Sequence, residues 1–326
     1  MYDAVVKTIN DIENIDSITI LQKLKKQLSR LIITSEYFDE RFLFYCELNG
    51  EDVILKIFCL DPSQILDNIH STVEASIMFS ATLTPLEYFS DILGGGRKSR
   101  TLLLASPFDR DNLFLGACGG VSTRYEDREK TLSQVVSYIA ATVACKKGNY
   151  LVYFPSYSYM NRAAELFMKR FPKVRTIVQN PRMNRTDING FISEFLNADG
   201  KMRVGFCVLG GIFSEGIDLP GKSLIGVVIV GTGVPGISSE RNIMREYYEL
   251  SRGCGYDYAY TSPGMNNVLQ AAGRVIRSDT DKGIVTLIDD RYITQKYREM
   301  YPDHWEKMQY FESAASLNSA ITEFWK

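Results

Sequence analysis

Short apolar runs alternate with segments of helical periodicity through the second half of the chain. The clearest run, residues 150–154, is followed by a helical pattern over residues 157–171, and the alternation continues to residue 289. Strands that are apolar at every position are buried on both faces, which is typical of a parallel sheet with helices on both sides. We therefore expect strands at residues 150–154, 174–178, 204–209, 224–230 and 284–289, and helices at 86–93, 130–146, 157–171 and 186–196.

The first 84 residues follow a different pattern. Residues 12–33 repeat apolar positions at helical spacing, and two apolar segments, 41–47 and 52–58, flank Asn49-Gly50, a strong signal for a hairpin turn. A run at residues 76–80 predicts a short buried strand. We therefore expect a helix and an antiparallel hairpin in residues 1–84, followed by an α/β domain over residues 85–326.

Composition places limits on the kind of partner. A chain of 326 residues with 45% hydrophobic and 23% charged residues can bury a large core. The net charge of -2 and the isoelectric point near 5.9 provide no global basic field. Any contact with nucleic acid must therefore come from a local groove.

Cysteine spacing and hydropathy bear on metal binding and on membrane contact. The six cysteines are scattered, no two form a CxxC pair, and there are two histidines, which argues against a zinc or iron–sulfur site in this chain. We expect no metal ligands here, and reduced thiols. No apolar run reaches the length of a membrane span and the first residues lack the apolar core of a signal peptide, so we expect a cytoplasmic protein without membrane contact.

The segment from Gln270 to Ser278 places polar groups on one side of an expected helix. Ser262 is a suitable N-cap and Pro263 suits the first helical position, so the pattern predicts a helix over residues 262–278. At about 100° per residue, Arg274 and Arg277 lie within roughly 40° of Gln270, and apolar residues occupy the other side. Such a face suits phosphate binding, although an amphipathic surface helix with two solvated arginines has the same pattern.

Polar residues follow several expected strands. Ser156 and Tyr157 follow the strand at 150–154, and Glu215, Gly216 and Asp218 follow the strand at 204–209. Ligands of open parallel sheets bind beyond the carboxyl ends of the strands. Two carboxylates beside flexible backbone can orient a cation-bound water, a ribose or an arginine, or can form an ordinary solvated loop.

Residues 216–223 match the phosphate-loop pattern GxxxxGK[ST]. A phosphate loop joins a strand to a helix, whose N-terminal amides bind the phosphates. Here Lys222 and Ser223 lead instead into the β-branched run 224–230, which has strand propensity. We therefore interpret this match as coincidental, and no acidic DE-box sequence for magnesium is present.

Four segments taken in order resemble motifs III, IV, V and VI of superfamily 2 DNA helicases. They are residues 80–85, 151–157, 211–221 and 270–278, and the most similar family is DinG- and XPD-like. The resemblance implies a RecA-like, P-loop-NTPase-type sheet with helices on both faces, forming the second motor domain. Residues 1–84 then resemble the end of the first motor domain and of its arch insertion. The phosphate loop, the DE-box and any iron–sulfur cysteines would belong to the rest of that domain, supplied in cis or in trans.

The same resemblance implies roles for individual residues. Arg274 and Arg277 would be arginine fingers for the γ-phosphate of ATP, with Gln270 sensing the nucleotide. Glu215, Gly216 and Asp218 would couple the nucleotide pocket to the DNA groove, and Ser80 and Thr82 would pass that state between domains. Ser156 and Tyr157 would contact single-stranded DNA, although Tyr157 suits a core position equally well.

The implied activity is ATP-driven translocation on single-stranded DNA in the 5′ to 3′ direction, with duplex unwinding. ATP and Mg²⁺ would be bound mainly by the first motor domain, so this chain alone would hydrolyse no ATP. Two alternatives stay open: a self-contained nucleotide-binding enzyme that uses Lys222, and a non-catalytic binding module with a helicase fold.

Overall fold

The computed structural model describes all residues except 1, 12–14, 97–98, 198–199, 216–218 and 220. It divides into two compact units, Met1–Met78 with Phe89–Arg100, and Phe79–Tyr88 with Thr101–Lys326.

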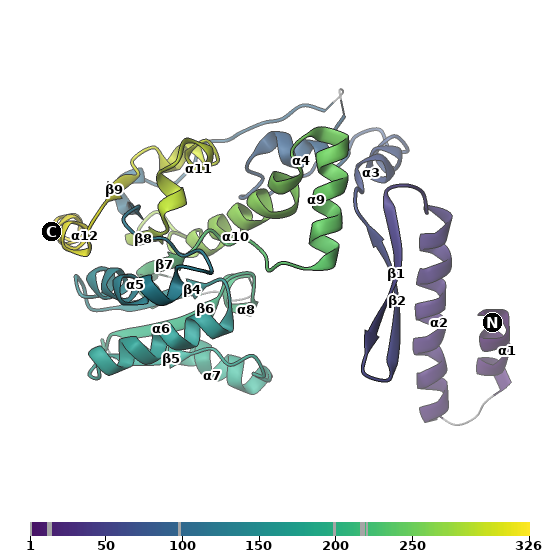
Figure 1. Cartoon of the computed structure of the whole chain (residues 1–326), viewed down its shortest axis with the longest axis horizontal. Helices are drawn as coiled ribbons and strands as arrows, with labels where there is room; N and C mark the ends of the chain where they lie inside the picture. Colours follow the sequence, from purple (N-terminus) through teal and green to yellow (C-terminus); the bar gives the residue numbers. More distant parts are fainter. Residues whose placement is uncertain (1, 12–14, 97–98, 198–199, 216–218, 220) are drawn as a thin grey trace. The chain divides into compact units, whose positions relative to one another are not determined.

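The first unit contains helices and the predicted hairpin (Figure 1). Strands β1 (Phe42–Asn49) and β2 (Asp52–Cys59) pair in antiparallel register from Phe42↔Cys59 to Asn49↔Asp52, so the hairpin prediction from Asn49-Gly50 is confirmed. Gly50 has a φ of 65°, a conformation that glycine adopts without steric cost. The helices of this region are α1 (Tyr2–Asp11), α2 (Ile15–Glu36), α3 (Ser63–His70) and α4 (Leu86–Ile92), the last of which crosses the boundary between the units.

The buried strand predicted at residues 76–80 is wrong. These residues form no strand and are all exposed, with Ile77 84% and Phe79 89% exposed. A strand is stable only when neighbouring strands satisfy its backbone hydrogen bonds, and no described strand pairs with this segment.

A parallel sheet of seven strands forms the second unit, with the order β5-β6-β4-β7-β8-β3-β9 (Figure 1). All five strands predicted in this region are confirmed within a few residues at their ends. Two further strands, β3 and β9, were not predicted. The strands are β3 (Leu113–Cys118), β4 (Asn149–Phe154), β5 (Arg175–Val178), β6 (Arg203–Val208), β7 (Gly226–Val230), β8 (Gly283–Ile288) and β9 (Gln309–Phe311).

Alternate residues of each central strand point into two separate cores. In β4, Tyr150, Val152 and Phe154 pack with α5, α6 and α12, whereas Leu151 and Tyr153 pack with α7, α8 and α10. The sheet is therefore covered by helices on both faces, as predicted. The helices are α5 (Arg128–Val143), α6 (Tyr157–Arg170), α7 (Arg185–Leu196), α8 (Ile212–Glu215), α9 (Ser239–Arg252), α10 (Ser262–Ala272), α11 (Gln295–Arg298) and α12 (Ala314–Phe324).

Short turns complete this unit. A π-helical turn, Asp257–Thr261, runs directly into α10, so Ser262 does not act as the predicted N-cap. The other turns are 3-10 helices at Arg110–Asn112, Gly221–Ser223, Asp290–Ile293 and Asp303–Trp305.

Candidate functional site

The carboxyl ends of β4, β6, β7 and β8 meet at one edge of the sheet because these strands are parallel. Ser156 and Tyr157 follow β4, the helix α8 follows β6, and Asp289 follows β8. Parallel sheets bind ligands at this edge, so the predicted residues lie where a ligand site is expected.

The predicted helix over residues 262–278 is shorter than expected. Helix α10 ends at Ala272, so Gln270 is helical but Arg274 and Arg277 are not. The carboxylate of Asp281 accepts hydrogen bonds from the backbone N–H groups of Arg277 (2.7 Å) and Ser278 (2.8 Å). These bonds replace those of a continuing helix, and the two arginines lie in the turn that follows α10.

The turn after α10 contacts the segment that follows β6. The Nε atom of Arg274 donates a hydrogen bond of 3.0 Å to the carbonyl oxygen of Ser214 in α8. The neighbouring Phe213 is fully buried, and its carbonyl oxygen accepts a 2.6 Å bond from the hydroxyl of Tyr153. The hydrogen bond from Arg274 to Ser214 therefore joins the segment that resembles motif VI to the segment that resembles motif V, next to the buried Phe213.

The other residues predicted for the nucleotide site differ in burial and in hydrogen bonding. Gln270 is half-buried, and its Oε1 atom is buried without a hydrogen-bond partner among the described residues. Arg277 is exposed. Glu215 is the last residue of α8, whereas its side chain and the predicted residues Gly216 and Asp218 lie outside what the structure describes.

Ser156 and Tyr157 have structural partners at the start of α6. Ser156 is the N-cap, and its side chain accepts a hydrogen bond from the backbone N–H of Tyr159. The Nε2 of Gln179 donates a 2.9 Å bond to the hydroxyl of Tyr157, and its Oε1 accepts one from the N–H of Val208. Burial raises the pKa of Tyr157. Tyr157 is half-buried, so part of its ring is available to a ligand.

Ser80 and Thr82 form a local turn. Their hydroxyl oxygens are 3.3 Å apart, and the Thr82 N–H donates a bond to the Ser80 hydroxyl. Ser80 is exposed.

A charged cluster beyond β8 and β3 was not predicted as part of the site. Asp289 is fully buried and accepts hydrogen bonds from the Nε (2.7 Å) and Nη2 (2.9 Å) of Arg291 and from the hydroxyl of Thr123. Burial favours the neutral acid, but the bonds and charge of Arg291 outweigh it, and the pKa of Asp289 is lowered. The polar run after residue 288 is the signal in the sequence that points to this cluster.

Three further side chains extend the cluster: Arg124 and Tyr125 are exposed, and Arg128 is half-buried. Arg124 pairs with Asp290 at 2.5 Å, and Arg128 lies over the rings of Tyr159 (4.8 Å) and Tyr125 (5.6 Å). Tyr125 is 86% exposed. An exposed aromatic ring beside arginines is a suitable platform for a nucleic-acid base and its phosphate.

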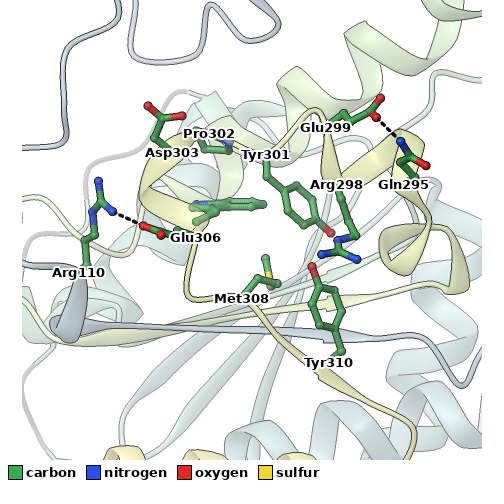
Figure 2. Close-up of a pocket in the computed structure, with 11 residues that line it drawn as sticks. Arg110, Gln295, Arg298, Glu299, Tyr301, Pro302, Asp303, Glu306, Met308 and Tyr310 are labelled. Atoms are coloured by element: carbon green, nitrogen blue, oxygen red, sulfur yellow. Dashed lines mark hydrogen bonds and ion pairs between the residues drawn. The ribbon is translucent and has the colours of Figure 1, made fainter.

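A separate cavity of about 790 Å³ lies beside β9 and α11 (Figure 2). Arg298 lies 5.2 Å from the ring centroid of Tyr310, and Arg110 pairs with Glu306 at 2.8 Å. None of the residues predicted for the candidate site lines this cavity.

The described residues include no group of three or more potential metal ligands among His, Cys, Asp and Glu. None of the helices described is long and apolar enough to cross a membrane.

The helicase C-terminal domain family matches residues 139–308, just over half of the chain. The chain belongs to this family. Among its relatives are the ATP-dependent DNA helicase DinG of Photobacterium profundum, 29% identical over 76% of this chain and 36% of that protein, and the ATP-dependent DNA helicase CHL1 of Scheffersomyces stipitis, 25% identical over 84% of this chain and 36% of that protein. The chain thus spans less than two-fifths of the length of these relatives.

Solved structures of similar fold include an apo XPD, with a TM-score of 0.62 and 21% identity over 95% of this chain and 62% of that one. An XPD helicase structure has a TM-score of 0.59 and 19% identity over 95% of this chain and 64% of that one. The RecA-like fold is therefore confirmed. The relatives and the family match confirm the assignment of this helicase C-terminal domain to the DinG- and XPD-like group of superfamily 2.

Proposed function

We propose that this chain is the second motor domain of an ATP-dependent DNA helicase, in which Arg274 and Arg277 contact the γ-phosphate of an ATP held by a first motor domain. The hydrogen bond between Arg274 and Ser214 carries this proposal, because it joins the turn after α10 to the segment after β6.

The donors present suit a phosphate. An arginine stays charged and offers a planar set of N–H donors, which stabilises the negative charge that develops as the phosphoryl group is transferred. The unpartnered Oε1 of Gln270 accepts a hydrogen bond from a hydroxyl or amino group of the nucleotide. Mg²⁺ neutralises phosphate charge when bound, and in this proposal its ligands belong to the first motor domain.

Two segments expose apolar side chains, which supports an interface with a first motor domain. Ile77 and Phe79 in one segment and Leu102 and Leu104 in the other are each at least 76% exposed. Exposed apolar runs of this kind mark surfaces that a partner covers. We propose that residues 1–84 belong with the first motor domain and residues 85–326 form the second, with residues 101–104 joining the interface between the two.

The nucleic acid in this proposal is single-stranded DNA that crosses the carboxyl edge. Ser156, Tyr157 and the cluster of Arg124, Tyr125 and Arg128 supply backbone contacts and base stacking. Stacking tolerates any sequence, as a translocating motor requires. Closing of the cleft on ATP and its reopening after hydrolysis would move the strand, in the 5′ to 3′ direction expected from the family.

The experiment that tests this proposal is ATP hydrolysis by the purified chain, with Mg²⁺, with and without single-stranded DNA. We expect no turnover from the chain alone, and DNA-stimulated turnover when the chain is joined to the first motor domain of a DinG helicase. Robust turnover by the chain alone, retained through further purification, would overturn the half-motor proposal.

The structure disfavours the enzyme that would use Lys222. The described residues Gly221–Ser223 form a 3-10 turn that leads into strand β7, whereas a phosphate loop leads into a helix. If the chain were a non-catalytic binding module, Arg274→Ala would leave DNA-stimulated ATP hydrolysis unchanged in the chain joined to a first motor domain.

A further inference from the structure

Five lysines line a pocket of about 540 Å³ at the amino ends of β4, β7 and β8. Lys146 and Lys147 precede β4, Lys222 precedes β7, and Lys282 immediately precedes β8; the fifth is Lys201. Because the strands are parallel, this pocket lies at the edge opposite to Ser156 and Asp289. It is therefore separate from the proposed DNA contacts of Ser156 and Tyr157. Asp281 in its wall accepts the backbone N–H of Arg277, so the turn after α10 reaches the pocket.

Aromatic rings at the end of α12 hold two of these ammonium groups in one patch. The Nζ of Lys146 lies 3.7 Å from the ring centroid of Trp325, and the Nζ of Lys282 lies 5.9 Å from the same ring and 4.6 Å from that of Phe324. Burial and the like charges of Lys282 and Lys222 lower the pKa of Lys146. Like charges collected in one pocket favour an anionic ligand.

Carboxylates do not neutralise this patch. None of the ion pairs between described residues includes Lys146, Lys222 or Lys282. The carboxylate that lines the pocket, Asp281, accepts the backbone N–H groups of Arg277 and Ser278.

Asn149 fixes two of the segments that form the pocket wall. Its side chain lines the pocket, is 5% exposed, and donates through Nδ2 to the carbonyl oxygens of Phe195 (2.9 Å) and Ser223 (3.1 Å). These bonds fix the amide so that Oδ1 is buried without a partner among the described residues.

We propose that this pocket binds a phosphate-bearing polyanion, with Lys146, Lys222 and Lys282 contacting phosphate oxygens. Its volume suits a small molecule, since ligand pockets occupy roughly 300 to 1,000 Å³. The phosphates can belong to a small polyphosphate or to a nucleic-acid backbone. In this proposal Lys222 binds phosphate from the pocket wall. The sequence Gly221-Lys222-Ser223 then contributes to phosphate binding without forming a phosphate loop.

The test is calorimetric titration of the full chain with inorganic tripolyphosphate at low ionic strength. We expect the Lys222→Ala/Lys282→Ala variant to bind at least about tenfold more weakly, because it lacks two charged hydrogen-bond donors. The charge-preserving Lys222→Arg/Lys282→Arg variant should retain binding, which separates lost charge from a folding defect.

Two controls locate the ligand. Lys130 is exposed in the first turn of α5, which is about 24 Å long for its 16 residues and has its other end at the pocket. Lys130→Ala should change affinity by less than about twofold, as for an isolated surface charge. Equal binding by the Lys222→Ala/Lys282→Ala variant, or a loss only in Arg274→Ala/Arg277→Ala, would place tripolyphosphate elsewhere and overturn the proposal.

A single-stranded oligonucleotide distinguishes the two sources of phosphate. A parallel loss of oligonucleotide and tripolyphosphate binding in Lys222→Ala/Lys282→Ala would assign the site to a nucleic-acid backbone. Loss of tripolyphosphate binding alone would assign it to a small polyphosphate. Both outcomes are independent of hydrolysis, so failure of this proposal is distinct from failure of the helicase proposal.

Discussion

The Nε of Arg274 donates to the carbonyl oxygen of Ser214 at 3.0 Å, although the two residues are 60 positions apart. The bond constrains the guanidinium at its Nε side and sets the direction of its terminal amino groups. Because a lysine ammonium is a point charge without this planar fork, it cannot reproduce both the bond and the contact with a phosphate.

Replacing Arg274 tests the arginine-finger role. In the chain joined to a first motor domain, we expect Arg274→Ala to lower DNA-stimulated ATP hydrolysis by about 10³-fold or more, and Arg274→Lys to restore little of it. The measurement is steady-state hydrolysis with saturating DNA. Arg175→Ala is the matched control, since Arg175 is an exposed arginine at the amino end of β5, paired with Glu194. A rate for Arg274→Ala equal to that of the control would contradict the proposed role.

The exposed leucines after the first unit test the domain interface. Leu102 and Leu104 are each 76% exposed, and burying a leucine contributes about 1.5 to 3 kcal/mol. We expect Leu102→Ser/Leu104→Ser to weaken the association with a separately supplied first motor domain, measured by calorimetry, while the unfolding midpoint of the chain itself stays the same. Leu250→Ser, at a residue that is 90% exposed in α9, is the control. Unchanged association would exclude residues 101–104 from the interface.

Tyr157 allows its structural and ligand-binding roles to be separated. Tyr157→Phe removes the hydroxyl bonded to Gln179 Nε2, so we expect it to lower the free energy of unfolding by about 1 kcal/mol and to leave DNA affinity unchanged. Tyr157→Ala should in addition weaken single-stranded DNA binding by the loss of one stacked base, about 1 to 3 kcal/mol. Fluorescence anisotropy with a labelled oligonucleotide measures the second effect. Equal DNA affinity of the Phe and Ala variants would assign Tyr157 to the core alone.

The buried pair of Asp289 and Arg291 predicts a pH dependence of stability. The pKa of Asp289 is lowered in the folded protein, so its contribution is fully present above the ordinary carboxyl pKa, about 4, and is lost as the pH falls through the lower folded value. At neutral pH we expect Asp289→Asn to be destabilised by about 3 kcal/mol, the lower part of the range for a broken buried pair, because Arg291 is partly exposed.

Urea unfolding of both proteins from neutral to acidic pH measures this effect. The stability difference between the wild type and Asp289→Asn should narrow below about pH 4, since the wild-type carboxylate is then being protonated. A difference that stays constant through this range would show that the charge of Asp289 does not stabilise the fold.

Local sequence patterns were sufficient for the central strands and the hairpin. Strands β4, β6, β7 and β8 are apolar at nearly every position because both faces are buried, and Asn49-Gly50 specifies a turn within two residues. Strand β3 was missed because Gly116, Ala117 and Cys118 have weak strand propensity. Strand β9 has three residues, too few to show a period. Helix α9 was not predicted, although Ser238 caps its start and Gly253 ends it in a left-handed conformation.

What the sequence determined by itself is the set of strands and helices and the order of the motifs, because these depend on residues that are near neighbours along the chain. The end of α10 also involves near neighbours, since the carboxylate of Asp281 accepts the N–H groups of Arg277 and Ser278. Only the tertiary contacts bring Arg274 to Ser214 and bring lysines from separate loops into one pocket. These contacts join residues tens of positions apart, and the order of strands in the sheet, which no local period encodes, brings them together.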